Sequence, residues 1–575
     1  MKHSMLMSTV LSLMAVMAAE RTPLWPEGKI PHFSDKQYAA PSQELKEPGF
    51  DRAVHRMPYL EWSEAPKGPK TDACVILISG GGYNCTCDGP AFKPLERKLL
   101  ENGITCVWLW YRSPRPAGLP IYQSGWEDGQ RAVRIVRAEA RKRGYSPEKI
   151  GVLGCSAGSH LSVMLGTSAL TPAYEPVDEL DKLPCHINWA LPMCPAYVLS
   201  DGFEGANKEK GQAPGLTVNP AFKFDAKTCP MCFFHGGDDP YSPNGSTQIY
   251  RQLRRMKIPA ELHLDAGRKH GPVKYEAFER AIEFMRQMGF LGKLAREERE
   301  DHRWHPDGTL RTEKEYLWPK GKMPKVGENE TYDPYLVWYI PEKPTTKAIQ
   351  VVLAGGGYGF CNYVGESLPV AHYLNQKGMT VVAVKYRCPR PRNQPKHMFG
   401  WTDAQRAIRM VRAEAPARGL DPNRIGTMGF SAGGHLTLMT ALSSLTNAYE
   451  PIDEIDKLSC SVQWACPIYP AYALTDGADV PNKTGGNADE AVPVPEFAFD
   501  AATPPMCFMH GDADGWAAMN SVKIWERLRL MGLQSDLHTL ALRGHCFQMS
   551  AAPGTGSYTW LDRIWEFYTR KGINR

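Results

Sequence analysis

Two serines stand in a sequence pattern that is typical of a nucleophile. Ser156 lies in GCSAG at 154–158, and Ser431 lies in GFSAG at 429–433. Both pentapeptides fit G-x-S-x-G, whose glycines allow a sharp turn from a strand into a helix, so that the serine hydroxyl projects above a sheet. The pentapeptide alone is a weak indication, because any glycine-rich turn can contain it. The residues that come later along the chain decide its meaning.

A serine hydroxyl becomes an effective nucleophile when a histidine takes its proton and an acid orients that histidine. Where G-x-S-x-G carries this chemistry, the acid follows the serine along the chain and the histidine comes last. We expect Asp239 and His270 to serve Ser156, and Asp514 and His545 to serve the second serine. A constant offset of 275 aligns the two aspartates, whereas their acidic neighbours align with residues that are not acidic.

Other histidines lie near these residues and are assigned structural roles. His263 and His538 fall inside strand-like runs, where a histidine is more often packed or hydrogen-bonded than catalytic. His160 and His435 follow the two serines by four residues, so a helix that begins at the serine would direct them into the fold. The chosen bases instead come just past a strand, in loops that can lower an imidazole onto the serine.

The tetrahedral intermediate of such a reaction requires N–H donors for its oxyanion. One donor should be the residue after each serine, and the others should come from the glycine-rich stretches SGGGY (79–83) and AGGGY (354–358). A flexible turn or a phosphate cradle is the alternative, but neither stretch continues as a P-loop or a dinucleotide-binding motif. The expected donors are Gly81, Gly82 and Ala157 for the first serine, and Gly356, Gly357 and Ala432 for the second.

The offset of 275 runs through much of the 575-residue chain and indicates a duplication. GGGY at 80–83 recurs at 355–358, and YEP at 174–176 recurs at 449–451. A unit of this size should bury its own core. We therefore predict a signal peptide (1–19), a first hydrolase copy (20–295) and a second copy (296–575), joined through the charged stretch 293–307.

Short apolar runs alternate with helical patterns inside each copy, and this alternation predicts an α/β fold. In the segment from 125 to 143, apolar residues recur at helical spacing. Strands that alternate with helices imply a mostly parallel sheet with helices on both faces. We expect the Gly- and Pro-rich insertions at 200–223 and 475–496 to form either a lid or pocket wall, or a plain surface loop. In the first copy the expected strands are 74–81, 105–112, 150–156, 187–193, 231–236 and 260–265.

Composition excludes several classes of protein. Apolar residues make up 43% of the chain and charged residues 22%, which is typical of globular proteins and argues against disorder, collagen and coiled coil. The net charge of +5 is spread over the chain without a long basic stripe, so a nucleic-acid partner is not expected. After the N-terminal region no apolar stretch of 18 or more residues occurs, and a membrane span is not expected either.

The first 19 residues resemble a secretory signal peptide. Lys2 and His3 precede an apolar run over 5–17, and the small pair Ala18-Ala19 comes next. We expect cleavage after one of these alanines and a secreted or periplasmic protein; an ordinary buried helix is the alternative.

The 15 cysteines do not demand a disulfide framework, because most lie inside apolar runs. Cys229 and Cys232 form a C-x-x-C, but no second pair lies at metal-site spacing, so neither a zinc site nor a redox function is expected there. Cys85 and Cys87 share a loop and could form disulfides elsewhere in an oxidising compartment.

The motifs together resemble the α/β-hydrolase superfamily, and among its members the secreted bacterial carbohydrate esterases of the acetylxylan esterase and feruloyl esterase type. The resemblance is carried by GGGY, a Tyr-Arg pair, G-[CF]-S-A-G-[GS]-H, HG-x-x-D and the late histidine, in both copies. The second copy follows the family pattern more closely and includes Glu366, whereas the first has Cys155, Ser159 and Ala91 at corresponding places.

This resemblance implies two tandem α/β-hydrolase domains that deacylate a plant polysaccharide or oligosaccharide through an acyl-enzyme, without metal or cofactor. Alternatives remain open: a feruloyl esterase, another small-ester hydrolase, a peptidase, or one copy that only binds carbohydrate or plays a structural part.

Overall fold

The computed structural model describes residues 20–33, 45–47, 50–63, 69–87, 92–200, 217–291, 311–325, 327–328, 332–475, 491–550, 556–557 and 559–575. The expected signal peptide, the expected junction at 293–307 and most of both Gly- and Pro-rich insertions lie outside these ranges. The domain boundaries at 19 and 295 therefore stay predictions. The first copy comprises the described residues up to 291, and the second copy comprises those from 311.

The first copy forms the strands and helices that its apolar pattern predicts. Each of the six expected strands is present and buried, and the expected helix at 125–143 is α2. Its strands are β1 (Arg21–Pro23), β2 (Leu45–Glu47), β3 (Phe50–Ala53), β4 (Tyr59–Trp62), β5 (Cys74–Ile78), β6 (Thr86–Cys87), β7 (Thr105–Trp110), β8 (Ile150–Cys155), β9 (Trp189–Met193), β10 (Leu199–Ser200), β11 (Thr217–Val218), β12 (Met231–Gly236) and β13 (Ala260–Asp265). Its helices are α1 (Lys93–Glu101), α2 (Gln123–Arg143), α3 (Ala157–Thr167), η1 (Glu179–Lys182), α4 (Asn244–Arg255) and α5 (Glu279–Gln287).

The second copy repeats this plan. Its strands are β14 (Arg311–Tyr316), β15 (Tyr335–Ile340), β16 (Ile349–Leu353), β17 (Thr380–Lys385), β18 (Ile425–Phe430), β19 (Trp464–Ile468), β20 (Leu474–Thr475), β21 (Val492–Pro493), β22 (Cys507–Gly511) and β23 (Asp536–Leu540). Its helices are η4 (Tyr363–Ser367), α6 (Leu368–Gln376), α7 (Met398–Glu414), η5 (Pro416–Arg418), α8 (Ala432–Leu442), η6 (Glu454–Lys457), α9 (Met519–Leu530), η7 (Phe547–Ser550) and α10 (Trp560–Lys571).

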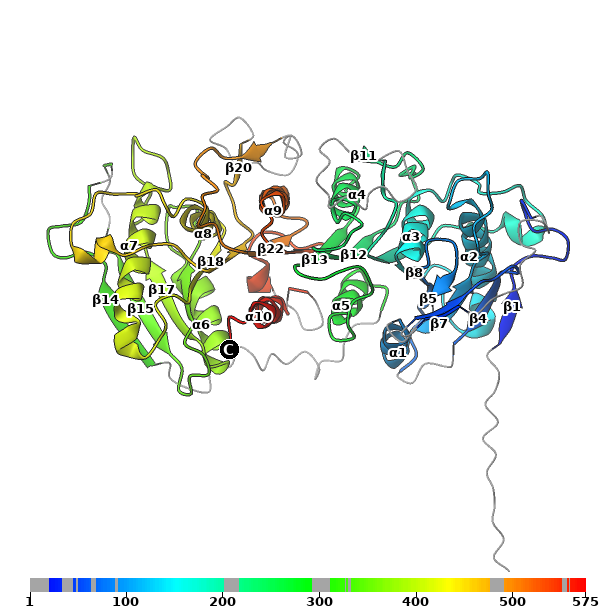
Figure 1. Ribbon diagram of the computed structural model, residues 1–575, viewed down its shortest axis with the longest axis horizontal. Coiled ribbons are helices and arrows are strands. Elements are labelled where there is room, and N and C mark those ends of the chain that lie inside the picture. The colour runs from blue at the N-terminus through cyan, green and yellow to red at the C-terminus, as the bar shows by residue number, and fades with distance from the viewer. Residues whose placement is uncertain are drawn as a thin grey trace, which may run out of the picture.

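Strand order is the same in both copies and is that of a mostly parallel sheet. The first copy contributes β1-β4-β7-β5-β8-β9-β12-β13, in which only the two outer pairings, β1 with β4 and β4 with β7, are antiparallel. The second copy contributes the corresponding order from β14 to β23. Helices lie on both sides of the sheet, with α4 and α9 on one side and α5 and α10 on the other (Figure 1). This confirms the predicted α/β-hydrolase fold class.

The two copies share one continuous 16-stranded sheet, a join that the strand pattern did not predict. The last strand of each copy, β13 and β23, pair in antiparallel orientation, with His263 opposite His538 and Leu264 opposite Leu537. His263 and His538 are 275 residues apart, so each histidine meets its own counterpart. A residue that contacts its counterpart is the signature of a two-fold interface, and the chain therefore contains the equivalent of a symmetric dimer.

The seam between the copies, formed by β13, β23 and their flanking helices, is rich in buried polar and charged groups. The Nδ1 atoms of His263 and His538 lie 3.2 Å apart, and burial together with the charge of Arg280 lowers the pKa of His263 well below its usual range. Arg563 of α10 reaches across to Glu283 of α5, and both side chains are almost fully buried. The two histidines are thus structural, as expected.

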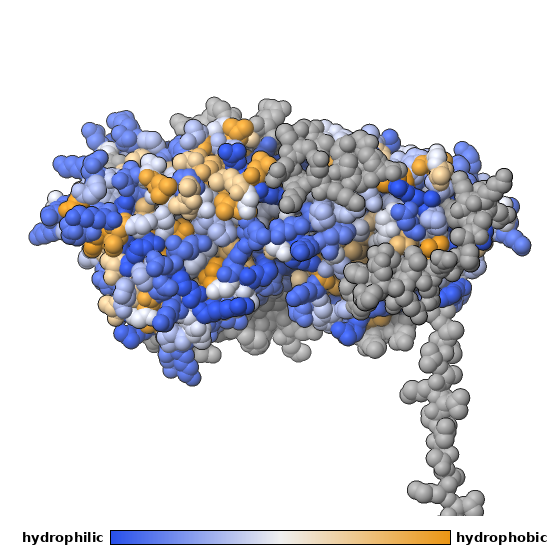
Figure 2. Space-filling model, in the orientation of Figure 1, coloured by the Kyte–Doolittle hydropathy of each residue, from blue (hydrophilic) through white to orange (hydrophobic). Residues whose placement is uncertain are grey.

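The surface agrees with a folded globular chain. On the face in Figure 2 hydrophilic side chains dominate, and hydrophobic ones form scattered patches, mostly over the second copy. None of the helices in the described ranges is both long and apolar enough to cross a membrane.

Candidate active site

Both serines occupy the turn that G-x-S-x-G predicts. Ser156 follows β8 and precedes α3 with φ 56° and ψ −118°, and Ser431 follows β18 with φ 54° and ψ −116°. A positive φ is strained for a residue that carries a Cβ. The flanking glycines permit it, because a Cβ on Gly154 would lie 2.2 Å from the carbonyl oxygen of Gly158, and one on Gly158 would lie 2.3 Å from that of Ile78.

In the first copy the structure brings the three predicted residues together. Nε2 of His270 lies 2.8 Å from Oγ of Ser156, and Nδ1 of the same ring lies 2.9 Å from Asp239 Oδ2. These hydrogen bonds link acid, base and hydroxyl in the order that proton transfer requires. Burial raises the pKa of Asp239, but hydrogen bonds from His235 and His270 outweigh it and hold that pKa below the usual range.

The second copy has the same geometry. Nε2 of His545 lies 2.7 Å from Oγ of Ser431, and Nδ1 lies 2.8 Å from Asp514 Oδ2. Burial opposes ionisation of this aspartate, yet hydrogen bonds from His510 and His545 lower its pKa to about 2. Both acids are therefore carboxylates at neutral pH and can stabilise a protonated imidazole.

Two further histidines hold the acids in place, and the sequence reasoning missed them. Nε2 of His235 lies 3.3 Å from Asp239 Oδ2, while Nδ1 lies 2.9 Å from Ser246 Oγ. His510 makes the equivalent contacts with Asp514 and Ser521 in the second copy. The signal that could have identified them is HG-x-x-D, which puts the histidine at the end of a strand and four residues before the acid.

The predicted oxyanion donors make no hydrogen bond through their N–H groups among the described residues. A Cβ on Gly80 would lie 2.9 Å from Cβ of Ser156, so the glycine-rich stretch touches the nucleophile. Across the described ranges, no hydrogen bond is found from the backbone N–H of Gly81, Gly82 and Ala157, or of Gly356, Gly357 and Ala432. Their role as donors stays a prediction, which this geometry allows.

His160 and His435 lie inside the fold, as expected of structural histidines. Nδ1 of His160 is 2.8 Å from the hydroxyl of Tyr83, and burial lowers the pKa of His160 to about 3. His435 makes the same bond, also at 2.8 Å, with Tyr358. Each pair connects the helix after the serine to the tyrosine of GGGY, which fixes the position of the glycine-rich loop.

The two sites differ beside the serine. In the second copy Glu366 accepts a hydrogen bond from the N–H of Gly355 and another, at 3.3 Å, from the hydroxyl of Tyr469. In the first copy Cys155 and Cys194 stand where the second has Phe430 and Tyr469. Ala91, which aligns with Glu366, lies outside the described residues.

Each acid loop is supported by the other copy. Nε2 of Gln534 donates to Asp238, beside the first acid, at 2.8 Å. In the other direction, the hydroxyl of Tyr250 donates to Oδ1 of Asp512 at 2.7 Å, and Arg254 forms an ion pair with the same carboxylate at 2.8 Å. A cavity of about 440 Å³ beside Asp239 is lined by residues of both copies. The seam thus positions both acid loops as well as joining the sheet.

Most of the side-chain groups that could bind a metal already take part in hydrogen bonds within the protein. Within the described residues, three clusters bring a thiol, a carboxylate and an imidazole within 4.8 Å of one another: Cys194, Asp239 and His270; Cys232, Glu261 and His263; and Cys507, Asp536 and His538. The first contains the triad residues, and in the second Glu261 already accepts from His263 at 3.0 Å and from the N–H of Ala541 at 2.9 Å. Burial raises the pKa of Cys229 and Cys232, so the C-x-x-C thiols stay protonated.

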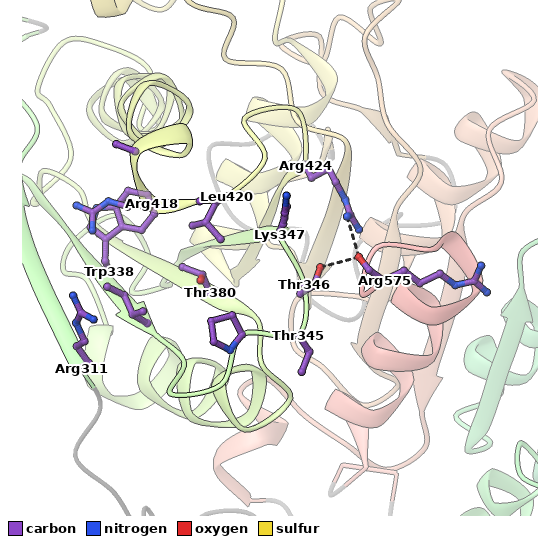
Figure 3. A pocket seen from close by; sticks show the side chains of 14 residues that line it. Arg311, Trp338, Thr345, Thr346, Lys347, Thr380, Arg418, Leu420, Arg424 and Arg575 are labelled. Carbon is purple, nitrogen blue, oxygen red and sulfur yellow. Dashed lines mark hydrogen bonds between the residues drawn. The ribbon is translucent and has the colours of Figure 1, made fainter.

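A basic cavity of about 760 Å³ lies apart from both triads, in the second copy (Figure 3). Nη1 of Arg424 and Oγ1 of Thr346 both donate to the backbone oxygen of Arg575, at 2.9 and 3.3 Å. Arg418 forms ion pairs with Glu313, at 2.6 Å, and with two other glutamates. These hydrogen bonds and ion pairs already engage much of the positive charge that lines the cavity.

Comparison with known proteins assigns the family. The model of the BD-FAE family matches residues 63–182 and 336–528, which together make up more than half of the chain. The chain belongs to the BD-FAE family. One matched segment lies in each copy, so each copy carries family sequence.

Several curated relatives of this BD-FAE chain are esterases. An acetylxylan esterase of Xylanibacter ruminicola is 26% identical over 221 residues, which cover 37% of this chain and 43% of the relative. A probable carboxylic ester hydrolase, LipM, of Mycobacterium tuberculosis is 28% identical over 235 residues, covering 37% of this chain and 53% of the relative. The chain thus spans about half the length of these relatives.

Among solved structures, an acetyl ester-xyloside bifunctional hydrolase from Caldicellulosiruptor lactoaceticus is similar, with 24% identity and a TM-score of 0.38, over 45% of this chain and 97% of that one. A butyrate-bound esterase, Est2, from Thermogutta terrifontis is similar with 25% identity and a TM-score of 0.36, over 46% of this chain and 95% of that one.

Proposed function

We propose that this BD-FAE chain is a serine hydrolase of carboxylic esters with one Ser-His-Asp site in each copy. The observation that carries the proposal is the pair of hydrogen-bonded triads, in which imidazole and hydroxyl lie 2.8 Å apart in the first copy and 2.7 Å apart in the second. Membership of BD-FAE and the names of the two curated esterases support the same reaction class.

The geometry supports an acyl-enzyme mechanism. Oγ of Ser431 attacks the ester carbonyl while Nε2 of His545 takes its proton, and Asp514 stabilises the imidazolium through Nδ1–H. We assign the stabilisation of the oxyanion charge to the N–H groups of Gly356, Gly357 and Ala432. Imidazolium then protonates the leaving alcohol, and a water activated by the same imidazole hydrolyses the acyl-serine. Ser156, His270 and Asp239 act in the same way in the first copy.

The proposed substrate is acylated xylan or a related plant polysaccharide. The proposed location is outside the cytoplasm, in line with the N-terminal sequence.

Aromatic rings beside both bases favour a small acyl group. The ring of Tyr241 lies 4.8 Å from that of His270, and Trp516 lies 6.4 Å from His545 and 4.5 Å from Tyr472, measured between centroids. We infer that such rings narrow the space beside the serine, and they offer faces for a sugar.

We expect the protein to release acetate from acetylated xylan. We expect kcat/KM for methyl ferulate to be lower by about tenfold or more, because the aromatic rings restrict a bulky acyl group. The measurement is acetate release by enzymatic assay beside ferulate release by chromatography, with the variant that lacks both serines as the blank. A faster rate on methyl ferulate would replace the acetyl specificity with a feruloyl one. Hydrolysis of neither ester, by a folded protein, would overturn the proposed function.

A further inference from the structure

Two cysteines of the first copy lie in contact directly beneath its triad. Cys155 ends β8 and precedes Ser156, and Cys194 follows the neighbouring strand β9. Their Sγ atoms are 3.5 Å apart, and both residues are buried, with 7% and 1% of their surface exposed. Both are reduced in the structure. The pair needs to approach by only about 1.5 Å to reach the S–S bond length of a disulfide.

Cys194 also touches the catalytic base. Its Sγ atom, a ring nitrogen of His270 and a carboxylate oxygen of Asp239 all lie within 4.8 Å of one another. Burial raises the pKa of Cys194, but the hydrogen bond from Cys155 and the nearby imidazole of His270 outweigh it and lower that pKa well below the usual range. The hydrogen bond to Cys194 raises the pKa of Cys155. Because Cys194 lies beside the imidazole of His270, we assign it as the attacking thiolate and Cys155 as the thiol that resolves its oxidation.

The second copy serves as an internal control. Its residues at the corresponding places are Phe430 and Tyr469, neither of which can form a disulfide. The ring of Tyr469 lies 4.8 Å from that of His545, and its hydroxyl bonds to Glu366. Where the first copy has these two thiols, the second therefore has two aromatic side chains.

We propose that Cys155 and Cys194 are a modification site at which hydrogen peroxide forms a disulfide, and that this oxidation activates the first triad without affecting the second. The thiolate of Cys194 attacks one peroxide oxygen, the O–O bond breaks, and the leaving hydroxide takes a proton from His270 to become water. The thiol of Cys155 then attacks the Cys194 sulfenic acid. The S–S bond forms, the S–O bond breaks, and the second hydroxide leaves as water with the Cys155 proton. Two thiols lose two electrons and one peroxide gains them.

Activation follows from the charge beside the base. Burial lowers the pKa of His270, but the neighbouring Cys194 thiolate and the Asp239 carboxylate outweigh it and raise that pKa to about 10, which reduces the fraction of rings that can accept the proton of Ser156. A disulfide carries no charge, and its formation draws Cys194 toward Cys155. The pKa of His270 then falls toward neutrality, and the ring recovers its function as a base.

The modification itself is tested by mass spectrometry, independently of the proposed function. The folded chain is treated with hydrogen peroxide, free thiols are alkylated, and peptides are mapped. A cross-link between the peptides of Cys155 and Cys194, absent from a Cys155→Ser variant and reversed by dithiothreitol, is expected. Persistence of both as alkylated thiols, under peroxide that oxidises other thiols of the chain, would overturn the proposal.

The effect on activity is tested in two variants that each keep one triad. In Ser431→Ala, which leaves the first triad, peroxide should raise kcat/KM for a small acetate ester at pH 7 by roughly tenfold or more, as expected when a protonated base becomes free. In Ser156→Ala, which leaves the second triad, the rate should stay constant. An unchanged or lower rate in Ser431→Ala despite the cross-link would contradict activation. If Ser431→Ala hydrolysed no ester either before or after peroxide treatment, the proposed esterase role of the first copy would be wrong. The cross-link found by peptide mapping would remain valid.

Discussion

Replacing both serines, Ser156→Ala with Ser431→Ala, is expected to lower kcat/KM for p-nitrophenyl acetate by about 10⁴-fold or more, because a triad without its nucleophile cannot form the acyl-enzyme. Each single variant should keep the activity of the other copy, since each triad contains residues of one copy alone. In the reduced protein the loss should be larger for Ser431→Ala if, as proposed above, the Cys194 thiolate raises the pKa of the first base, His270.

The control is Ser459→Ala, which changes an exposed serine outside both triads. Its rate should equal that of the wild type, and circular dichroism should show all variants folded. Retention of more than a tenth of wild-type activity by the folded double variant would show that another group is the nucleophile.

A second large effect is expected at the seam. Arg563→Met removes the cation that faces Glu283 across the seam, where the side chains are only 2% and 4% exposed. A carboxylate left buried without its partner costs about 3–5 kcal/mol in the free energy of unfolding. Urea unfolding followed by tryptophan fluorescence should therefore show a lower midpoint, with α5 and α10 losing their contact first.

The matched control removes both charges. Arg563→Met with Glu283→Leu leaves no buried unpaired ion, so most of the lost free energy should return. Equal midpoints for Arg563→Met and the wild type would mean that this ion pair does not hold the copies together. If the double variant were as unstable as Arg563→Met, the lost free energy of unfolding would come from altered packing around α10 and not from the unpaired charge.

The local parts of this molecule were predictable from sequence. Glycines within a few residues of Ser156 specify its turn. Short apolar runs specify the buried strands. The order serine, acid, histidine then limited the search to loops after later strands. The constant offset between the copies identified Asp239 rather than its neighbour Asp238 as the acid. If both copies use the same triad, the acid must be present at aligned positions, and only Asp239 aligns with an aspartate in the second copy.

The contacts between the copies were not predictable in this way. The strand pattern of β13 shows that it is buried but leaves open which strand lies beyond its edge, because pairing between distant segments is not encoded by the period of either one. Glu261 and His263 break the apolar pattern of that strand, and the structure shows that they face the seam. Cys155 and Cys194 belong to different strands, and only the folded sheet brings their thiols together.

The central claim is that both copies carry a reactive serine, and a fluorophosphonate probe tests it most directly. After peroxide treatment, the wild-type chain should bind two probe molecules, one at Ser156 and one at Ser431, as read from intact mass and peptide mapping. Each single alanine variant should bind one, and the double variant none. Labelling at neither serine, or at only one of them, in a protein that still hydrolyses esters, would contradict this claim.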